Sequence, residues 1–235
     1  MVKKKVSRKN QELKNHGKEE EIPGLNQNKL RYVIGICLVL VGFCILIPRF
    51  QSKMGAAKLP NPQETITTDT REPSEKKPDQ AVDFQVAADQ PKLITIDSIN
   101  VSGYLQRVGL NTNKTIAVPN NIHYAGWYVD SVLPGQKGLS IIDGHVSGRY
   151  SDGVFKQLYR LRKSDIVTIE YGDGSRKKFE VLNVTTKPEA EAAEALFTQE
   201  PNVDYQLNLI TCGGNFNSNT QTYDDRVIVS TKLMQ

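Results

Sequence analysis

The sequence has few cysteines and no excess of positive charge outside its first segment. Its three cysteines are Cys37, Cys44 and Cys212, and the first two lie inside one apolar run, which excludes a disulfide framework for any folded region. Residues 1–31 carry nine Lys and Arg against four Glu, which leaves 21 basic and 22 acidic side chains for the rest. A folded part without surplus positive charge is not typical of nucleic-acid-binding proteins.

Several motifs of common enzyme classes are missing as well. There is no G-x-S-x-G turn of a serine hydrolase and no glycine-rich P-loop for nucleotide phosphates. His123, His145 and Cys212 show no paired ligand spacing, and the loop 215–225 lacks the ordered acids of a calcium loop. We therefore expect no metal and no cofactor.

One apolar run stands near the N-terminus. Residues 32–48 read YVIGICLVLVGFCILIP without a charge, and Lys or Arg flanks the run on both sides. This length is at the short end of what spans a bilayer, and the basic segment before it is expected to stay in the cytoplasm. We predict a single-pass signal-anchor at 32–48, with a cytoplasmic tail at 1–31 and the remainder outside the cell. A cleaved signal peptide and a buried core helix are the less favoured alternatives.

The chain after this run divides into two parts. Residues 49–90 are rich in Pro, Thr, Glu, Asp and Lys with few large apolar side chains, which predicts a disordered linker. Residues 91–235 form one domain of common size. Short apolar or alternating runs with turn residues between them predict a mainly β fold, a closed or nearly closed antiparallel barrel, with helical pieces at 154–161 and 188–196.

Three residues of this domain could carry chemistry together. Cys212 ends the apolar run LNLITC, and Arg226 opens the run RVIVS, so antiparallel pairing of the two would place both residues at one end of a sheet. His145 also follows an apolar run directly. A thiolate can attack a carbonyl, an imidazole can protonate a leaving amine, and a guanidinium can stabilise an oxyanion. This combination favours acyl transfer.

Simpler interpretations of the same residues stay open at this point. A lone cysteine is most often a small buried hydrophobe, although an idle thiol is a liability in an oxidising compartment. A lone histidine is more often a structural hydrogen-bonding group. His123 is the less favoured alternative to His145 as the acid and base, because no strand end precedes it.

The motifs around these residues resemble one known family. LITCGG at 209–214, DGHV at 143–146 and RVIV at 226–229 are similar, in kind and order, to the cysteine, histidine and arginine motifs of the sortases. The shorter matches AGWY at 125–128 and PGQKG at 134–138 agree with them. The resemblance covers about residues 93–233, nearly the whole predicted domain.

The resemblance implies an eight-stranded sortase-type β-barrel with short helices and a membrane-anchored cysteine transpeptidase of Gram-positive-type bacteria. Such an enzyme cleaves a C-terminal LPxTG-like sorting signal of a secreted protein after its threonine, and an amine then attacks the thioester. Its partners would thus be secreted proteins with a sorting signal and an amine acceptor such as a cell-wall precursor. Carried over, Cys212 is the nucleophile, His145 the acid and base and Arg226 the oxyanion clamp, while Trp127 and Ile210 are candidate substrate contacts.

Other functions remain as alternatives. The N-terminal anchor and compact domain resemble the housekeeping-like sortase classes D, E and F, and no apolar run follows Thr231, which makes a pilin-polymerising sortase less favoured. A peptidoglycan L,D-transpeptidase has its histidine two residues before its cysteine, whereas here they are residues 145 and 212. A non-catalytic tethered binding module would not need all three residues.

Overall fold

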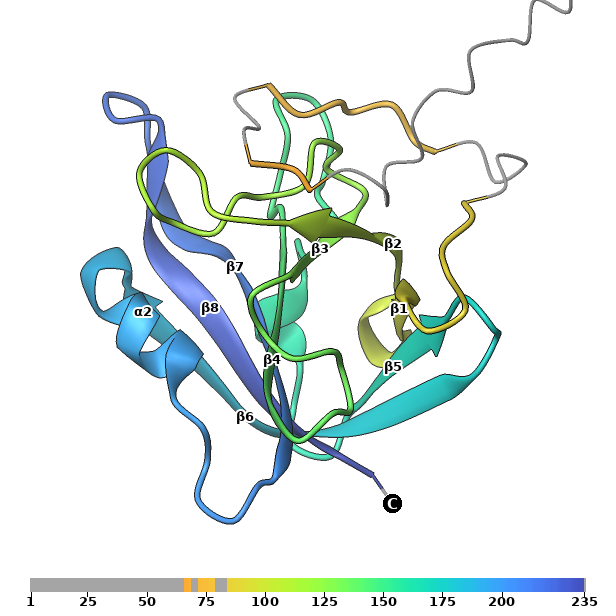
Figure 1. Cartoon of the computed structure of the whole chain (residues 1–235). Coiled ribbons are helices and arrows are strands. Elements are labelled where there is room, and N and C mark those ends of the chain that lie inside the picture. The colour runs from red at the N-terminus through yellow and green to blue at the C-terminus, as the bar shows by residue number, and fades with distance from the viewer. Residues whose placement is uncertain (1–65, 69–71, 79–83, 235) are drawn as a thin grey trace, which may run out of the picture. The chain divides into compact units, whose positions relative to one another are not determined.

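Eight strands close into a barrel in the computed structural model, which describes residues 66–68, 72–78 and 84–234. Around the barrel the order is β1-β2-β3-β4-β7-β8-β6-β5 (Figure 1). The predicted closed, eight-stranded, mainly β fold is therefore confirmed. The strands are β1 (Pro91–Ile96), β2 (Val101–Val108), β3 (Ala125–Tyr128), β4 (Gly138–Gly144), β5 (Ile166–Tyr171), β6 (Arg176–Pro188), β7 (Tyr205–Asn217) and β8 (Thr222–Leu233).

Two of the pairings in the barrel are parallel. β2 runs parallel to β3, and β4 runs parallel to β7, while the other six pairs are antiparallel. The expectation of an antiparallel barrel was wrong at these two places. Each parallel pair needs a long connection, and residues 109–124 supply it between β2 and β3.

The helical elements are short. α2 (Glu189–Phe197) follows Pro188 directly and has acids in its first turn, which confirms the helix predicted at 188–196. The helix predicted at 154–161 is wrong, because only a 3-10 turn, η2 (Leu158–Arg160), forms there; a second one, η1, spans Asp97–Ile99. Backbone N–H groups at the start of that segment bond instead to distant carbonyls, Val154 to Ile122 and Phe155 to His145.

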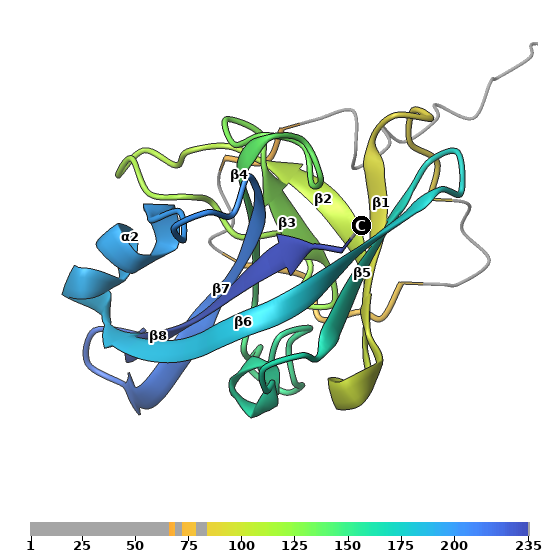
Figure 2. The ribbon, with the colours of Figure 1, turned by 90° about the horizontal axis from the view of Figure 1, so that it is seen from below.

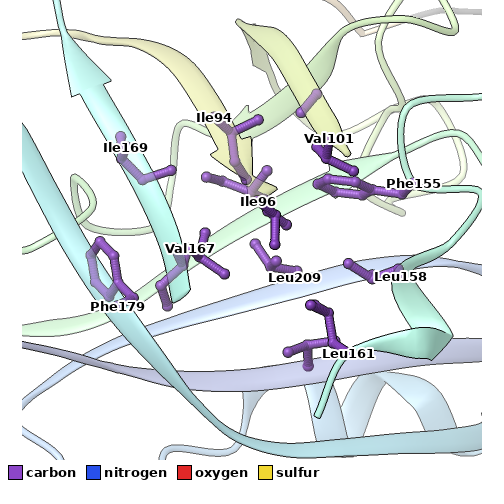
Figure 3. Packing of buried hydrophobic residues seen from close by; sticks show 14 of the residues in the cluster. Ile94, Ile96, Val101, Phe155, Leu158, Leu161, Val167, Ile169, Phe179 and Leu209 are labelled. Atoms are coloured by element: carbon purple, nitrogen blue, oxygen red, sulfur yellow. The ribbon is translucent and has the colours of Figure 1, made fainter. Parts of the chain in front are cut away.

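The main core fills the inside of the barrel. Along β5 every second residue is buried, as expected for a strand with one face toward a core. Figure 3 shows Phe155, Leu158 and Leu161, which follow β4, packed among the isoleucines and valines of the strands. All three are 1% exposed or less. Their spacing of three residues suits tight turns and lets the segment close one end of the barrel.

A second apolar cluster lies on the other face of the sheet. We call it the outer apolar face, and its members are Val108, Tyr128, Ile141, Ala192, Leu196 and Ile228, with Ile116, Leu139, Ala195 and Ile210 packed against them. Figures 1 and 2 show α2 outside the barrel against β6 and β8, so Ala192 and Leu196 cover part of this face. These strands are therefore apolar on both faces, which is why they read as continuous apolar runs.

Parts of the predicted linker are attached to the barrel. Thr67 donates its N–H to the Arg107 carbonyl at 3.0 Å and accepts from the Gly109 N–H at 2.9 Å. Ser74 bridges to Asn121, and Phe84 is buried against the Tyr104 ring. The prediction of a disordered stretch does not hold for these residues, because their backbone groups pair with the barrel.

The predicted cytoplasmic tail at 1–31 and membrane anchor at 32–48 lie outside the described residues. Within the described part of the chain, no helix is long and apolar enough to cross a membrane. The tail and the anchor therefore stay predictions.

The attached segments should stabilise the domain. A fragment of residues 84–235 lacks the hydrogen bonds of Thr67 and Ser74 that a fragment of residues 66–235 keeps. With about 1 kcal/mol for each bond and partial compensation by chain entropy, we expect a loss of about 2 kcal/mol, or a melting temperature about 4–8 °C lower. Calorimetry of both fragments checks this. Equal melting temperatures would show that these contacts add no stability.

Candidate active site

Cys212 and Arg226 face each other across two neighbouring strands. In the antiparallel pair of β7 and β8, Cys212 is the direct partner of Arg226. Directly opposed residues of antiparallel strands project to the same face, with Cβ atoms about 4.5–5.5 Å apart. The prediction that they meet at one end of a sheet is confirmed.

The same end of the barrel brings His145 close to this pair. β4 runs parallel to β7, with Asp143 paired to Ile210, and both strands continue toward the same rim. The Thr211 hydroxyl, itself buried, donates to the Gly144 carbonyl at 2.7 Å. This bond links the residue before Cys212 to the residue before His145. It therefore fixes the backbone positions of Cys212 and His145 relative to each other on adjacent strands.

The imidazole of His145 is oriented by a backbone carbonyl. Its Nε2 lies 2.7 Å from the Pro119 carbonyl oxygen. A carbonyl only accepts hydrogen bonds, so Nε2 carries the proton of the neutral ring and Nδ1 is left as the basic nitrogen. His145 can therefore act as a base through Nδ1 while Pro119 holds the ring.

Arg226 is held by three acceptors. Its Nη1 donates to the carbonyls of Tyr223 and Asp225, each at 2.8 Å, and its Nη2 donates to the Glu189 carboxylate. The Arg226 side chain is 17% exposed and the Glu189 side chain is 56% exposed. The two carbonyls fix the planar guanidinium through Nη1, while the more exposed carboxylate bonds to Nη2.

Burial keeps both the thiol and the imidazole neutral. It raises the pKa of Cys212 above its ordinary value of 9.0; the Arg226 guanidinium opposes this shift, and the Glu189 carboxylate adds to it. Burial lowers the pKa of His145 below 6.5, although the bond to Pro119 acts the other way. A neutral thiol beside a neutral imidazole is therefore the main form at neutral pH, and the reactive thiolate forms as the imidazole takes its proton.

Asp143 is a further polar residue of this face, and the sequence did not single it out for chemistry. It is 4% exposed, and its Oδ1 has no hydrogen-bond partner among the described residues. Burial raises its pKa well above the ordinary value, which favours the neutral carboxyl. A Cβ on Gly126 would lie 2.3 Å from Oδ1, so a larger residue there would have to displace the Asp143 carboxyl.

The two glycines after Cys212 lie at an irregularity of strand β7. The pairing of β7 with β8 shifts register between Gly213 and Phe216, which is a β-bulge, and Gly214 has a φ of 71°. A Cβ at Gly214 would also lie 2.1 Å from a carboxylate oxygen of Asp224.

The remaining predicted residues fall in different places. Trp127 belongs to the inner core, and its Nε1 donates to the Val132 carbonyl, so it faces away from Cys212 and its predicted substrate contact is not supported. Ile210 shares the outer face with Cys212 and keeps its place as a candidate contact. His123 bonds through Nε2 to the Glu75 carbonyl. Among the described residues no three His, Cys, Asp or Glu are grouped as metal ligands.

Residues 94–234, more than half of the chain, match the protein family described as the Sortase domain. The chain belongs to the sortase family. The family resemblance seen in the motifs is thereby confirmed, and with it a transpeptidase domain. A comparison with curated protein sequences found no match.

Several solved sortase structures are similar to this sortase. Sortase C-1 from Actinomyces oris is 24% identical, over 61% of this chain and 73% of that chain, with a TM-score of 0.46. A lid mutant of sortase A from Corynebacterium diphtheriae is 22% identical, over 66% and 76%, with a TM-score of 0.49. Sortase A from Listeria monocytogenes is 20% identical, over 63% and 88%, with a TM-score of 0.46.

Glu189 of this sortase should lower the reactivity of the Cys212 thiol. Because its charge raises the pKa of Cys212, Glu189→Gln should lower that pKa and increase the thiolate fraction at pH 7. We expect Cys212 to react with iodoacetamide about 2–3 times faster, measured by mass spectrometry of the peptide that contains it. Glu191→Gln, on the same helix and exposed, is the matched control. An unchanged or slower rate in Glu189→Gln would contradict the assigned sign.

Proposed function

We propose that this protein is a cysteine transpeptidase that cleaves an LPxTG-like sorting signal after its threonine and transfers the new carboxyl end to an amine. The observation that carries the proposal is the register of β7 and β8, which sets Cys212 opposite Arg226 beside the strand that ends before His145. A nucleophile, a base and a fixed cation at one rim are what acyl transfer requires.

The first half of the proposed reaction forms a thioester. The sulfur of Cys212 attacks the threonine carbonyl carbon while Nδ1 of His145 takes the thiol proton. The negative oxygen of the tetrahedral intermediate is stabilised by the guanidinium of Arg226. The C–N bond then breaks, and the imidazolium gives its proton to the leaving amine, so that charge and atoms balance.

The second half releases the product. An acceptor amine attacks the thioester carbon, and His145 takes a proton from the attacking nitrogen. The C–S bond breaks, an amide forms, and the sulfur regains its proton from the imidazolium. Neutral thiol and neutral imidazole are thus restored, which is the form that burial of both groups favours. The acceptor we propose is a cell-wall precursor.

The outer apolar face supplies a place for the sorting signal. Ile210 lies on this face two residues before Cys212 and is partly exposed, as are Ile116, Leu139 and Ala195 of the same face. An apolar face of this kind suits the Leu and Pro side chains of the signal. We further propose that residues 32–48 anchor the enzyme in the cell membrane, with the barrel on the outside.

Removal of the sulfur tests the nucleophile. Cys212→Ala should abolish both cleavage and transfer of an LPxTG peptide in the presence of an acceptor amine, by at least about 10³-fold, because no other described side chain at the rim can form a thioester. Products are measured by liquid chromatography and mass spectrometry. Cys44→Ala, which changes another thiol of the chain, should retain full activity. Cleavage by Cys212→Ala at the wild-type rate would refute the proposed mechanism.

Replacement of the guanidinium tests the oxyanion role. Arg226→Lys keeps the charge but cannot bond in a fixed plane to Tyr223 and Asp225 as well as to the substrate, so kcat/KM should fall about 10²-fold. Arg176→Lys, at an exposed ion pair with Glu170, should change it little. Near-wild-type kcat/KM in Arg226→Lys would remove Arg226 from this role.

A further inference from the structure

A short segment before the barrel is bound to the loop that follows His145. We call residues 74–76 the strap. The Glu75 carboxylate accepts hydrogen bonds from the Arg149 N–H, from the Tyr150 N–H at 3.0 Å and from the Ser151 hydroxyl at 2.8 Å. Gly148 lies against the same carboxylate, and a Cβ there would be 2.6 Å from Cδ of Glu75. One carboxylate thus binds three consecutive residues at the tip of the loop 146–153.

This loop packs directly on the backbone of His145. The Gly153 N–H donates to the Val146 carbonyl at 3.1 Å, and the Gly148 N–H donates to the Ser151 carbonyl at 2.8 Å, so the loop folds back on itself. Gly153 lies so close that a Cβ would be 2.2 Å from the His145 carbonyl oxygen. A displacement of the loop tip would therefore also displace the backbone of His145, because the two are in close contact.

The strap also holds the segment that orients the imidazole. Ser74 donates its N–H to the Asn120 carbonyl at 2.8 Å and accepts from the Ile122 N–H at 3.0 Å. The Asn121 side chain donates to the Lys76 carbonyl at 2.9 Å. These contacts fix the chain immediately after Pro119, whose carbonyl is the acceptor for Nε2 of His145.

We propose that Glu75 is a positioning residue for His145: through the strap it ties together the loop that packs on the histidine backbone and the segment that orients its ring. Glu75 does not touch the sulfur or the substrate in this role. The inference rests on the proposed function, because it assigns Glu75 to the acid and base of that reaction. It also gives the chain between the predicted anchor and the barrel a part in positioning His145.

The test replaces the carboxylate in the full-length protein. Glu75→Gln keeps the size but puts an NH₂ group, which cannot accept, beside donors of the loop. We expect kcat for peptide cleavage to fall about 10-fold with KM within about 2-fold, because the groups that bind substrate stay in place while the base is misaligned. The control is Glu72→Gln, the same change three residues earlier, where the carboxylate makes no hydrogen bond or ion pair with the described residues.

A second readout does not depend on substrate. The chain has three histidines, so the His145 ring can be assigned by nuclear magnetic resonance with a His145→Gln variant. Burial lowers the pKa of His145, and looser packing in Glu75→Gln should move it back up toward 6.5, with no change in Glu72→Gln. Asp143, Glu189, Cys212 and Arg226, the other ionisable groups of this rim, are the same in both variants.

The outcomes separate the two proposals. If the wild-type protein cleaves no sorting-signal peptide but the His145 titration moves in Glu75→Gln, the proposed function fails and the contact network stands. If the wild type is active and Glu75→Gln matches Glu72→Gln in kcat and titration, the positioning role is refuted. If Glu75→Gln does not fold, Ser151→Ala is the deciding variant, because it removes one hydrogen bond to Glu75. It should lower kcat about 2–3-fold. An unchanged kcat and an unchanged His145 titration in Ser151→Ala would refute the positioning role.

Discussion

The site depends on β7 being hydrogen-bonded on both sides in one register. β4 fixes it from one side through parallel pairing, and β8 fixes it from the other through antiparallel pairing. A slip of one residue would send Cys212 to the inner core and bring Thr211 to the outer face. The buried bond from Thr211 to the Gly144 carbonyl opposes such a slip, because a shifted Thr211 would leave both polar groups unpaired.

The groups around Cys212 and Arg226 favour an uncharged thiol and imidazole when no substrate is bound. The guanidinium of Arg226 opposes the effect of burial on the thiol, yet it is partly neutralised by Glu189, and Asp143 adds a buried carboxyl nearby. Burial of His145 keeps its ring uncharged. A thiol that stays protonated until substrate arrives is protected from oxidation, since the thiolate is the species that oxidants attack. Low resting reactivity suits an enzyme whose barrel we propose to lie outside the cell.

Local sequence signals predicted the helix α2 and the meeting of Cys212 with Arg226, because these features depend on the residues that begin a helix or end a strand. Local signals did not predict the features that depend on pairing between residues far apart in the sequence. β3 has only four residues, all buried, and so shows no alternation. The Pro119 carbonyl, the Glu189 contact and the Glu75 strap join residues far apart in sequence, and nothing local marks them.

Direct capture of the covalent intermediate tests the central claim. The full-length protein is mixed with an LPxTG peptide without acceptor amine, quenched in acid and digested for mass spectrometry. Acylation of Cys212 by the peptide up to its threonine, released by hydroxylamine, is the predicted result. Cleavage of the peptide with the acyl group on another residue, or with no adduct at Cys212 at any time, would contradict the account.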